Sequence, residues 1–114
     1  MAKQDDHAQV YVRFHEAVNM RPADIEDWLE TPESRAVGFK RDGGESVGHA
    51  SGRRIVQILR TPRAELDGGD YAHMRKVVGF VRRHLAQGPH QEHKIPGSRW
   101  RYSLMNWGHD PLKD

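Results

Sequence analysis

Basic side chains at helical spacing are the residues in this sequence with the clearest chemistry. Arg53, Gln57 and Arg60 fall on one side of a helix when each residue is rotated by about 100° from the one before it. Arginine pairs with phosphate, and both arginine and glutamine hydrogen-bond base edges. This face therefore predicts contact with nucleic acid, largely through phosphate, with Gln57 as the residue that touches bases.

A second basic face lies further along the chain. Lys76 and Arg83 are seven residues apart, opposite the apolar stripe of a helix expected over residues 70–87. Like the first face, this one contains no acidic residue. Arg75 and Arg82 flank the stripe, and we expect their aliphatic stems to cover apolar surface. The residues predicted to bind nucleic acid are Arg53, Arg54, Gln57, Arg60, Lys76, Arg83, Arg99 and Arg101.

The charge distribution favours an anionic partner. The 114-residue chain has a formal net charge of +2, but the stretch from Arg53 to His109 holds eleven Lys and Arg against four acids. Such a region is an argument for nucleic acid, expected to be DNA with RNA as the alternative, and says nothing about fold. The competing interpretation is a solvated surface, because every amphipathic helix needs a polar face.

Four main helices are expected to position these residues. The first covers about residues 7–18, and the second begins at Pro22, a residue favoured at the first helical position. Thr31 caps a further short turn. The third runs from about Ser51 to Arg60, and the fourth starts at an Asp70 cap. The apolar stripes are Val10, Phe14 and Val18; Ile25, Trp28 and Leu29; Ile55, Ile58 and Leu59; and Tyr71, Met74, Val78, Val81 and Leu85.

The expected fold class is all-α, a compact single domain over residues 1–114. Residues 98–111 are too rich in aromatic and apolar side chains for a disordered tail, and we expect a short helix there that packs on the bundle. Residues 88–97 are expected to be a flexible connector. Because Trp, Tyr and Arg are enriched at interface hot spots, residues 98–111 also predict the alternative function, a protein-interaction or homodimerisation module.

A Gly-rich segment precedes the third helix. Residues 38–52 contain five glycines and are expected to form a loop. Ser46 and Ser51 precede Arg53 and Arg54, so a helix N-terminus and two guanidiniums could converge on an anion there. The segment has neither the P-loop nor the dinucleotide-binding glycine spacing. A flexible connector with a serine cap is the alternative.

Several other function classes lack a supporting pattern. The sequence has no cysteine and no H-E-x-x-H, and His90 and His93 fall in the expected connector, so we expect no metal and no cofactor. His73 and His84 share a helical face with Phe80, where packing or hydrogen bonding is expected rather than ligation. No catalytic constellation is fixed by the spacing, and we expect no enzyme activity.

Patterns that the sequence lacks also predict where the protein is located in the cell and how it contacts DNA. No window is apolar enough for a transmembrane helix, and the first twenty residues lack the apolar centre of a secretory signal. Together with the lack of cysteine, this predicts a cytoplasmic protein. About nine residues separate the third and fourth helices, whereas a helix-turn-helix uses about 3–4. The expected contact is therefore a basic helix face.

Three segments of the chain resemble a known family. They are residues 44–55, beginning Gly44-Glu45-Ser46-Val47-Gly48-His49; residues 71–79, Tyr71-Ala72-His73-Met74-Arg75-Lys76-Val77-Val78-Gly79; and residues 100–111, beginning Trp100-Arg101-Tyr102. Together with residues 22–38, they are similar to the DUF3140 family over nearly the whole chain. Members of that family are often labelled DNA-binding, so the resemblance implies the same function. It carries over no catalytic motif.

Overall fold

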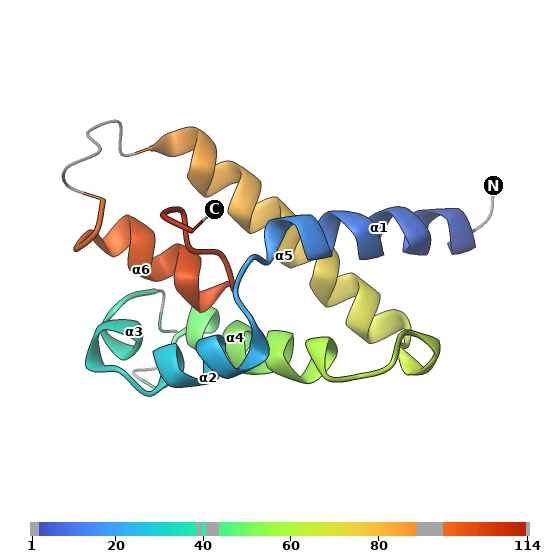
Figure 1. Cartoon of the computed structure of the whole chain (residues 1–114), viewed down its shortest axis with the longest axis horizontal. Coiled ribbons are helices and arrows are strands. Elements are labelled where there is room, and N and C mark those ends of the chain that lie inside the picture. The colour runs from blue at the N-terminus through green and yellow to red at the C-terminus, as the bar shows by residue number, and fades with distance from the viewer. Residues whose placement is uncertain (1–2, 39, 41–43, 89–94, 114) are drawn as a thin grey trace.

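The protein is helical throughout the part of the chain described. A computed structural model describes residues 3–38, 40, 44–88 and 95–113, and within these residues there is no strand. The expected all-α fold class is confirmed. Figure 1 shows the arrangement of the elements, which are α1 (Lys3–Ala17), α2 (Pro22–Leu29), α3 (Pro32–Ala36), α4 (Val47–Leu59), the 3-10 helix η1 (Arg63–Glu65), α5 (Gly68–Gln87) and α6 (Arg99–Asn106).

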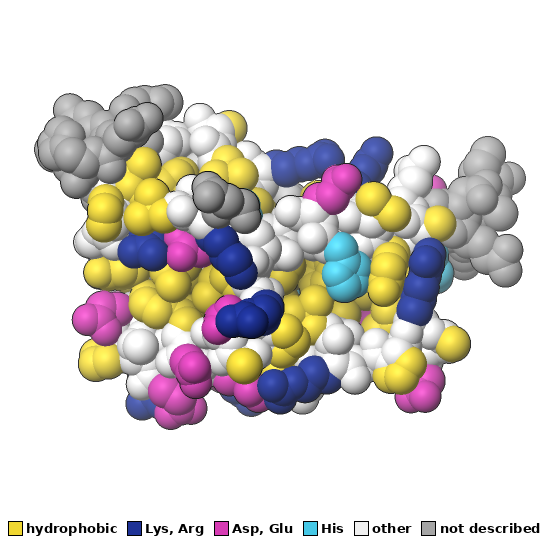
Figure 2. Space-filling model, viewed as in Figure 1, with side chains coloured by type: hydrophobic (Ala, Val, Ile, Leu, Met, Phe, Trp, Pro, Cys, Tyr) yellow, Lys and Arg dark blue, Asp and Glu magenta, His cyan; other side chains and the backbone are white. Residues whose placement is uncertain are grey.

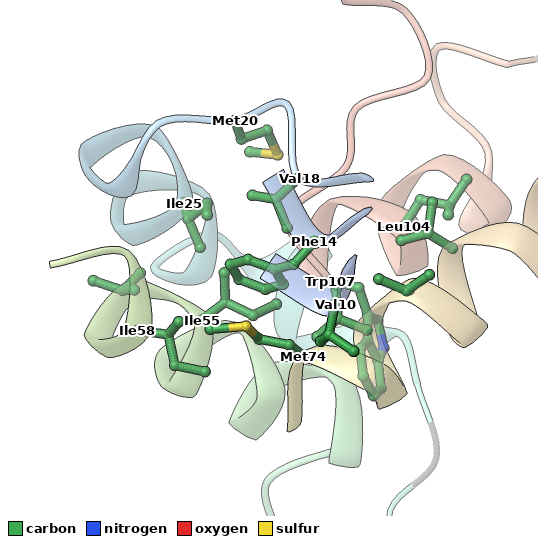
Figure 3. Packing of buried hydrophobic residues seen from close by; sticks show 14 of the residues in the cluster. Val10, Phe14, Val18, Met20, Ile25, Ile55, Ile58, Met74, Leu104 and Trp107 are labelled. Carbon is green, nitrogen blue, oxygen red and sulfur yellow. The ribbon is translucent and has the colours of Figure 1, made fainter. Parts of the chain in front are cut away.

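Two helix pairs and a bridging helix make up the molecule. α1 packs along α5, and α2 packs along α4 (Figure 1). α6 contacts α2, α3, α4 and α5, so it ties the two pairs together. One core cluster runs through all of these helices except α3. Phe14, Ile55 and Met74 meet at its centre and are fully buried (Figure 3).

The apolar stripes expected from the sequence are mostly buried. Val10, Phe14 and Val18 of the first helix all lie in the core. Leu85 is the exception, because it is 43% exposed although it continues the stripe of the fourth helix. The α5 part of the core ends at Val81, and Leu85 lies in the last turn beyond it.

The predicted loop over residues 38–52 is wrong in its second half. α4 begins at Val47, where Ser46 caps it by accepting a hydrogen bond from the His49 N–H at 3.0 Å. Gly52 therefore lies inside a helix. A Cβ there would come within 2.7 Å of the Asn106 carbonyl oxygen, so the missing side chain is what lets α4 approach α6. Residues 41–43 lie outside the described residues.

The cap of α5 is Asp67 rather than the expected Asp70. Asp67 accepts from the Asp70 N–H at 2.9 Å, and Asp70 accepts from the Asp67 N–H at 3.1 Å. This capping box satisfies two backbone donors at once, and both carboxylates lie near the positive end of the helix dipole. The sequence misplaced the cap by three residues because both positions of the box are aspartate.

The C-terminal segment forms a short helix. Ser98 caps α6 by accepting from the Arg101 N–H at 3.0 Å, and Leu104 and Trp107 are buried in the core. The ring of Trp100 is half-buried against the core cluster. Of the predicted connector at residues 88–97, residues 89–94 lie outside the described residues.

A buried amide holds α6 to α2 and α3. Asn106 is 1% exposed, and its side-chain oxygen accepts from Trp28 Nε1 at 2.7 Å and from Ser34 Oγ at 2.5 Å. Its side-chain nitrogen donates to the Ser34 carbonyl at 3.1 Å. Both polar atoms of this amide are therefore paired with groups from two other helices.

Replacing the amide should destabilise the fold. We expect Asn106→Ala to lower the free energy of unfolding by about 3 kcal/mol, because two donors and a carbonyl are left without their buried partner. Ser103→Ala, on the same helix and outside this network, is the control and should cost less than about 1 kcal/mol. Urea denaturation followed by circular dichroism measures both. Equal losses in the two variants would contradict this role of Asn106.

Candidate nucleic-acid interface

The basic face predicted on α4 is paired with carboxylates. Arg53 donates to Glu45 from Nε at 2.9 Å and from Nη2 at 2.6 Å. Arg60 donates to both oxygens of Glu26, at 2.7 and 2.8 Å. Such two-bonded pairs are the strong geometry for guanidinium and carboxylate. The hydrogen bond from Arg53 holds the pKa of the Glu45 carboxyl at about 2, so this group is ionised at neutral pH.

Gln57 lies in an acidic setting. The groove between α2 and α4 is lined by Glu26, Asp27 and Glu30 together with Arg53, Arg60 and Gln57. Three carboxylates therefore surround the residue predicted to touch bases. A phosphate that approaches this groove meets like charges as well as the arginines.

The other predicted arginines outside α5 are also engaged. Arg54 donates to Asp70 at 3.0 Å, and Arg101 donates to both oxygens of Asp110 at 3.0 Å. Burial alone would raise the pKa of Asp110, but hydrogen bonds, chiefly from Arg101, outweigh it and the pKa is lowered. Arg99 donates to the Ala36 carbonyl at 3.3 Å and is otherwise exposed.

α5 carries the opposite arrangement. Its exposed residues Arg75, Lys76, Arg82 and Arg83 make no ion pair within the described residues, and no acid follows Asp70 on this helix. We call these four residues the α5 basic face. At helical spacing, Arg75 and Arg82 form one pair along the helix, and Lys76 and Arg83 form another. The small residues Ala72, Gly79 and Ala86 lie between these two pairs.

Each flank of the α5 basic face borders a groove. On one side, Arg75 and Arg82 line a groove shared with Arg13 of α1, which also contains Asp6. On the other side, Arg75, Lys76 and Arg83 line a cavity against α4 and α6, and no carboxylate of the described residues lines that cavity. Lys76 and Arg83 thus lie together as the sequence predicted.

The structure does not bring all the predicted residues to one surface. Arg53, Gln57 and Arg60 share the α2–α4 groove, whereas Lys76 and Arg83 share the cavity beside α6. Arg54 and Lys76 border one further hollow, which also contains Glu45. On the face shown in Figure 2, Lys and Arg lie among Asp and Glu, and no area of the described residues on that face is basic alone.

Sequence reasoning missed three exposed cations. Arg75 and Arg82 were expected to cover apolar surface, and Arg13 was not singled out, yet all three line the groove between α1 and α5. A local signal was present for α5. None of the residues three or four positions away from its four cations is acidic, so no pairing partner is available within the helix.

Aromatic rings stack along the inner side of the α5 basic face. Trp107 lies between Phe80, at 4.3 Å between ring centroids, and His73, at 6.1 Å. Phe80 also stacks on His84 at 3.8 Å. Because these rings are nearly parallel, we call them the four-ring stack. His73 Nε2 makes a hydrogen bond with Ser51 Oγ at 2.8 Å, so the expected packing or hydrogen bonding is confirmed, for His73 by both and for His84 by ring packing.

Burial lowers the pKa of both histidines. Desolvation is the largest cause that lowers the pKa of His73 and of His84, and nearby cations add to it. The Phe80 carbonyl favours protonated His84 slightly, but Nδ1 of His84 is buried without a hydrogen bond of normal geometry. The pKa of His15 of α1 is shifted in the same direction, by burial and then by Arg63.

The comparison with known families agrees with the resemblance seen in the sequence. Residues 13–105 match DUF3140, a family described as a protein of unknown function. The chain belongs to this family. No curated protein and no solved structure matches this DUF3140 chain. Within the described residues, no helix is both long and apolar enough to cross a membrane, and no group of three or more candidate ligands could hold a metal ion.

Stability should fall in mildly acidic solution. In the unfolded chain the histidines titrate near 6.5, whereas the pKa values of His15, His73 and His84 are lower in the fold. Protons therefore bind the unfolded state first, so stability is complete above pH 6.5 and is lost as the pH falls toward the folded pKa values.

Chemical denaturation at about pH 7 and about pH 5.5, on either side of the ordinary histidine pKa, measures this loss. In the double variant His73→Phe/His84→Phe, phenyl rings replace the two imidazoles of the four-ring stack, so the stack keeps four rings but loses two titrating groups. We expect its free energy of unfolding to change less between the two pH values than that of the native chain. An equal change would contradict the assignment.

Proposed function

We propose that the protein binds nucleic acid, DNA before RNA, through the phosphate backbone and by way of the α5 basic face. The observation that carries this proposal is that Arg75, Lys76, Arg82 and Arg83 make no ion pair within the described residues, whereas the arginines of α4 are paired with carboxylates. A cytoplasmic location, expected from the sequence, fits this role.

An unpaired cation is the better phosphate contact because nothing must be displaced. At Arg53 or Arg60, a phosphate has to compete with a carboxylate that already makes two hydrogen bonds. At the α5 basic face, the phosphate replaces only water and counterions. The counterions condensed on the nucleic acid are released when its phosphates are neutralised, and this release is the main driving force of non-specific nucleic-acid binding.

The shape of the helix surface supports contact along a backbone. Gly79 lies between the two pairs of cations and borders the hollows on both flanks of α5. Ala72 and Ala86 extend this low strip at seven-residue spacing. The Arg83 guanidinium lies over Gly79, so a phosphate that reaches this strip contacts that guanidinium, with Arg75 and Arg82 on one side and Lys76 on the other. Phosphate contacts position a protein without selecting sequence, so we expect little sequence preference.

The alternative module uses the aromatic segment at residues 98–111, and no observation favours it over nucleic acid. The N–H groups of Trp28 and Trp100 donate to Asn106 and to the His84 carbonyl, and Trp107 is 8% exposed. These rings contribute to the core of this chain, which leaves little aromatic surface for a second copy. Homodimerisation stays a prediction.

Matched charge removals test the proposal. Arg82→Gln/Arg83→Gln removes two unpaired cations, and Arg53→Gln/Arg60→Gln removes two paired ones, so both variants change the net charge equally. Binding to a fluorescent duplex, measured by anisotropy across salt concentrations, should weaken about tenfold or more in the α5 variant. Its plot of log K against log salt should flatten by about 1.8, at about 0.9 for each phosphate that is no longer neutralised.

The control variant should bind within about threefold of the native chain, because its cations are already neutralised by carboxylates. Equal weakening in both variants would contradict the α5 assignment, because net charge alone would then account for binding. Undetectable binding of the native chain at low salt would contradict nucleic-acid binding as a whole. The same titration with single-stranded RNA and with heparin ranks DNA against the other polyanions.

A further inference from the structure

The cavity between α5, α6 and the start of α4 has the properties of a ligand site. Its volume is about 580 Å³, within the usual range of roughly 300–1,000 Å³ for small-molecule pockets. We propose that this cavity binds a small organic anion, with a flat apolar body and one carboxylate, phosphate or sulfonate group. This site shares Arg75, Lys76 and Arg83 with the α5 basic face, but it lies in the cavity on one flank of that face, and it does not require that the protein bind nucleic acid.

The polar groups around the cavity are mainly donors. Arg75, Lys76 and Arg83 can only donate hydrogen bonds, and no acidic side chain of the described residues lines the cavity. A ligand group that only accepts, such as a carboxylate or a sulfonate, satisfies all of them. A cation would find no carboxylate of the described residues there.

Trp107 supplies an independent observation. The indole N–H groups of Trp28 and Trp100 donate at 2.7 and 2.6 Å, as buried indoles usually do. Trp107 is also buried, but within the described residues its Nε1 makes no hydrogen bond. Figure 3 shows this nitrogen on the side of the ring away from Phe14 and Ile55. The free donor therefore lies outside the apolar core, at the edge that borders the cavity.

Two glycines keep the polar groups of the wall accessible. A Cβ at Gly48 would lie 3.0 Å from Trp107 Nε1 and would cover the donor. A Cβ at Gly79 would lie 3.1 Å from Arg83 Nη1, so the Arg83 guanidinium folds over this glycine beside the cavity. Gly48 and Gly79 are unusual choices inside helices, where glycine is disfavoured.

The apolar part of the wall suits a flat body. Val47, Phe80 and Trp107 provide it, and Val47 is 42% exposed although it is large and apolar. The faces of Phe80 and Trp107 are occupied within the four-ring stack. Ring edges are therefore available to the ligand, and edges carry the positive part of the aromatic quadrupole. They favour an anion as the cations do.

Calorimetric titration with naphthalene-2-sulfonate tests the site. We expect saturable binding of one molecule per chain. The uncharged 2-naphthalenemethanol should bind at least about tenfold more weakly. Arg83→Gln should lower the sulfonate affinity about tenfold, as expected for the removal of a charge-assisted hydrogen bond. Arg82→Gln is the matched control on the same helix, since Arg82 lines only the opposite groove, and its sulfonate affinity should be unchanged.

Trp107→Phe removes the N–H and keeps an aromatic ring. We expect about fivefold weaker sulfonate binding, measured well below the melting temperature of the variant, which this substitution in the core should lower. Gly48→Ala, which covers the same donor, gives a second measure if the Trp107 variant unfolds. Absence of binding, equal affinity for the uncharged compound, or equal weakening in Arg82→Gln and Arg83→Gln would overturn the proposal. Because Arg82→Gln weakens only nucleic-acid binding, the two functions can fail separately.

Discussion

The pairing of arginines with carboxylates is the constraint on which the proposed function depends. Glu26, Glu45 and Asp110 each make two hydrogen bonds with an arginine, and Asp70 makes one with Arg54. Exposed ion pairs contribute little to stability, so their main effect here is to cancel charge. Four of the cations that make no ion pair within the described residues lie together on α5. A chain with a formal charge of only +2 can therefore present a local surface of four uncompensated cations.

The packing of α6 fixes the position of the α5 basic face. Asn106 joins α6 to α2 and α3 through fully paired polar atoms, and Trp107 inserts between His73 and Phe80 of α5. α1 covers another side of α5. With two sides packed, the rotation of α5 about its axis is fixed, and the α5 basic face is the side that remains in solvent. The same insertion of Trp107 forms one wall of the cavity beside it.

Local patterns in the sequence predicted the fold class, the apolar stripes and the starts of α2 and α3, because these depend on residues within one or two turns. The first, third and fourth expected helices begin three to four residues earlier than predicted, at Lys3, Val47 and Gly68. They also predicted that Lys76 and Arg83 lie together, since both are on one helix. Whether the arginines of α4 are free to contact nucleic acid depends on carboxylates that lie far along the chain, which local patterns do not reveal. Glu26 is 34 residues from Arg60, and its position follows from the packing of α2 on α4. Gly52 was wrongly assigned to a loop for the same reason, because a glycine is needed there only where α6 packs closely against α4.

Arginine footprinting with phenylglyoxal, quantified by mass spectrometry with and without duplex DNA, tests the role of charge pairing most directly. In the free protein, we expect Arg75, Arg82 and Arg83 to react several-fold faster than Arg53, Arg60 and Arg101, whose guanidiniums are held by carboxylates. Added duplex should slow only the α5 arginines. Faster reaction of the α4 arginines, or their protection by DNA in place of those on α5, would contradict the account.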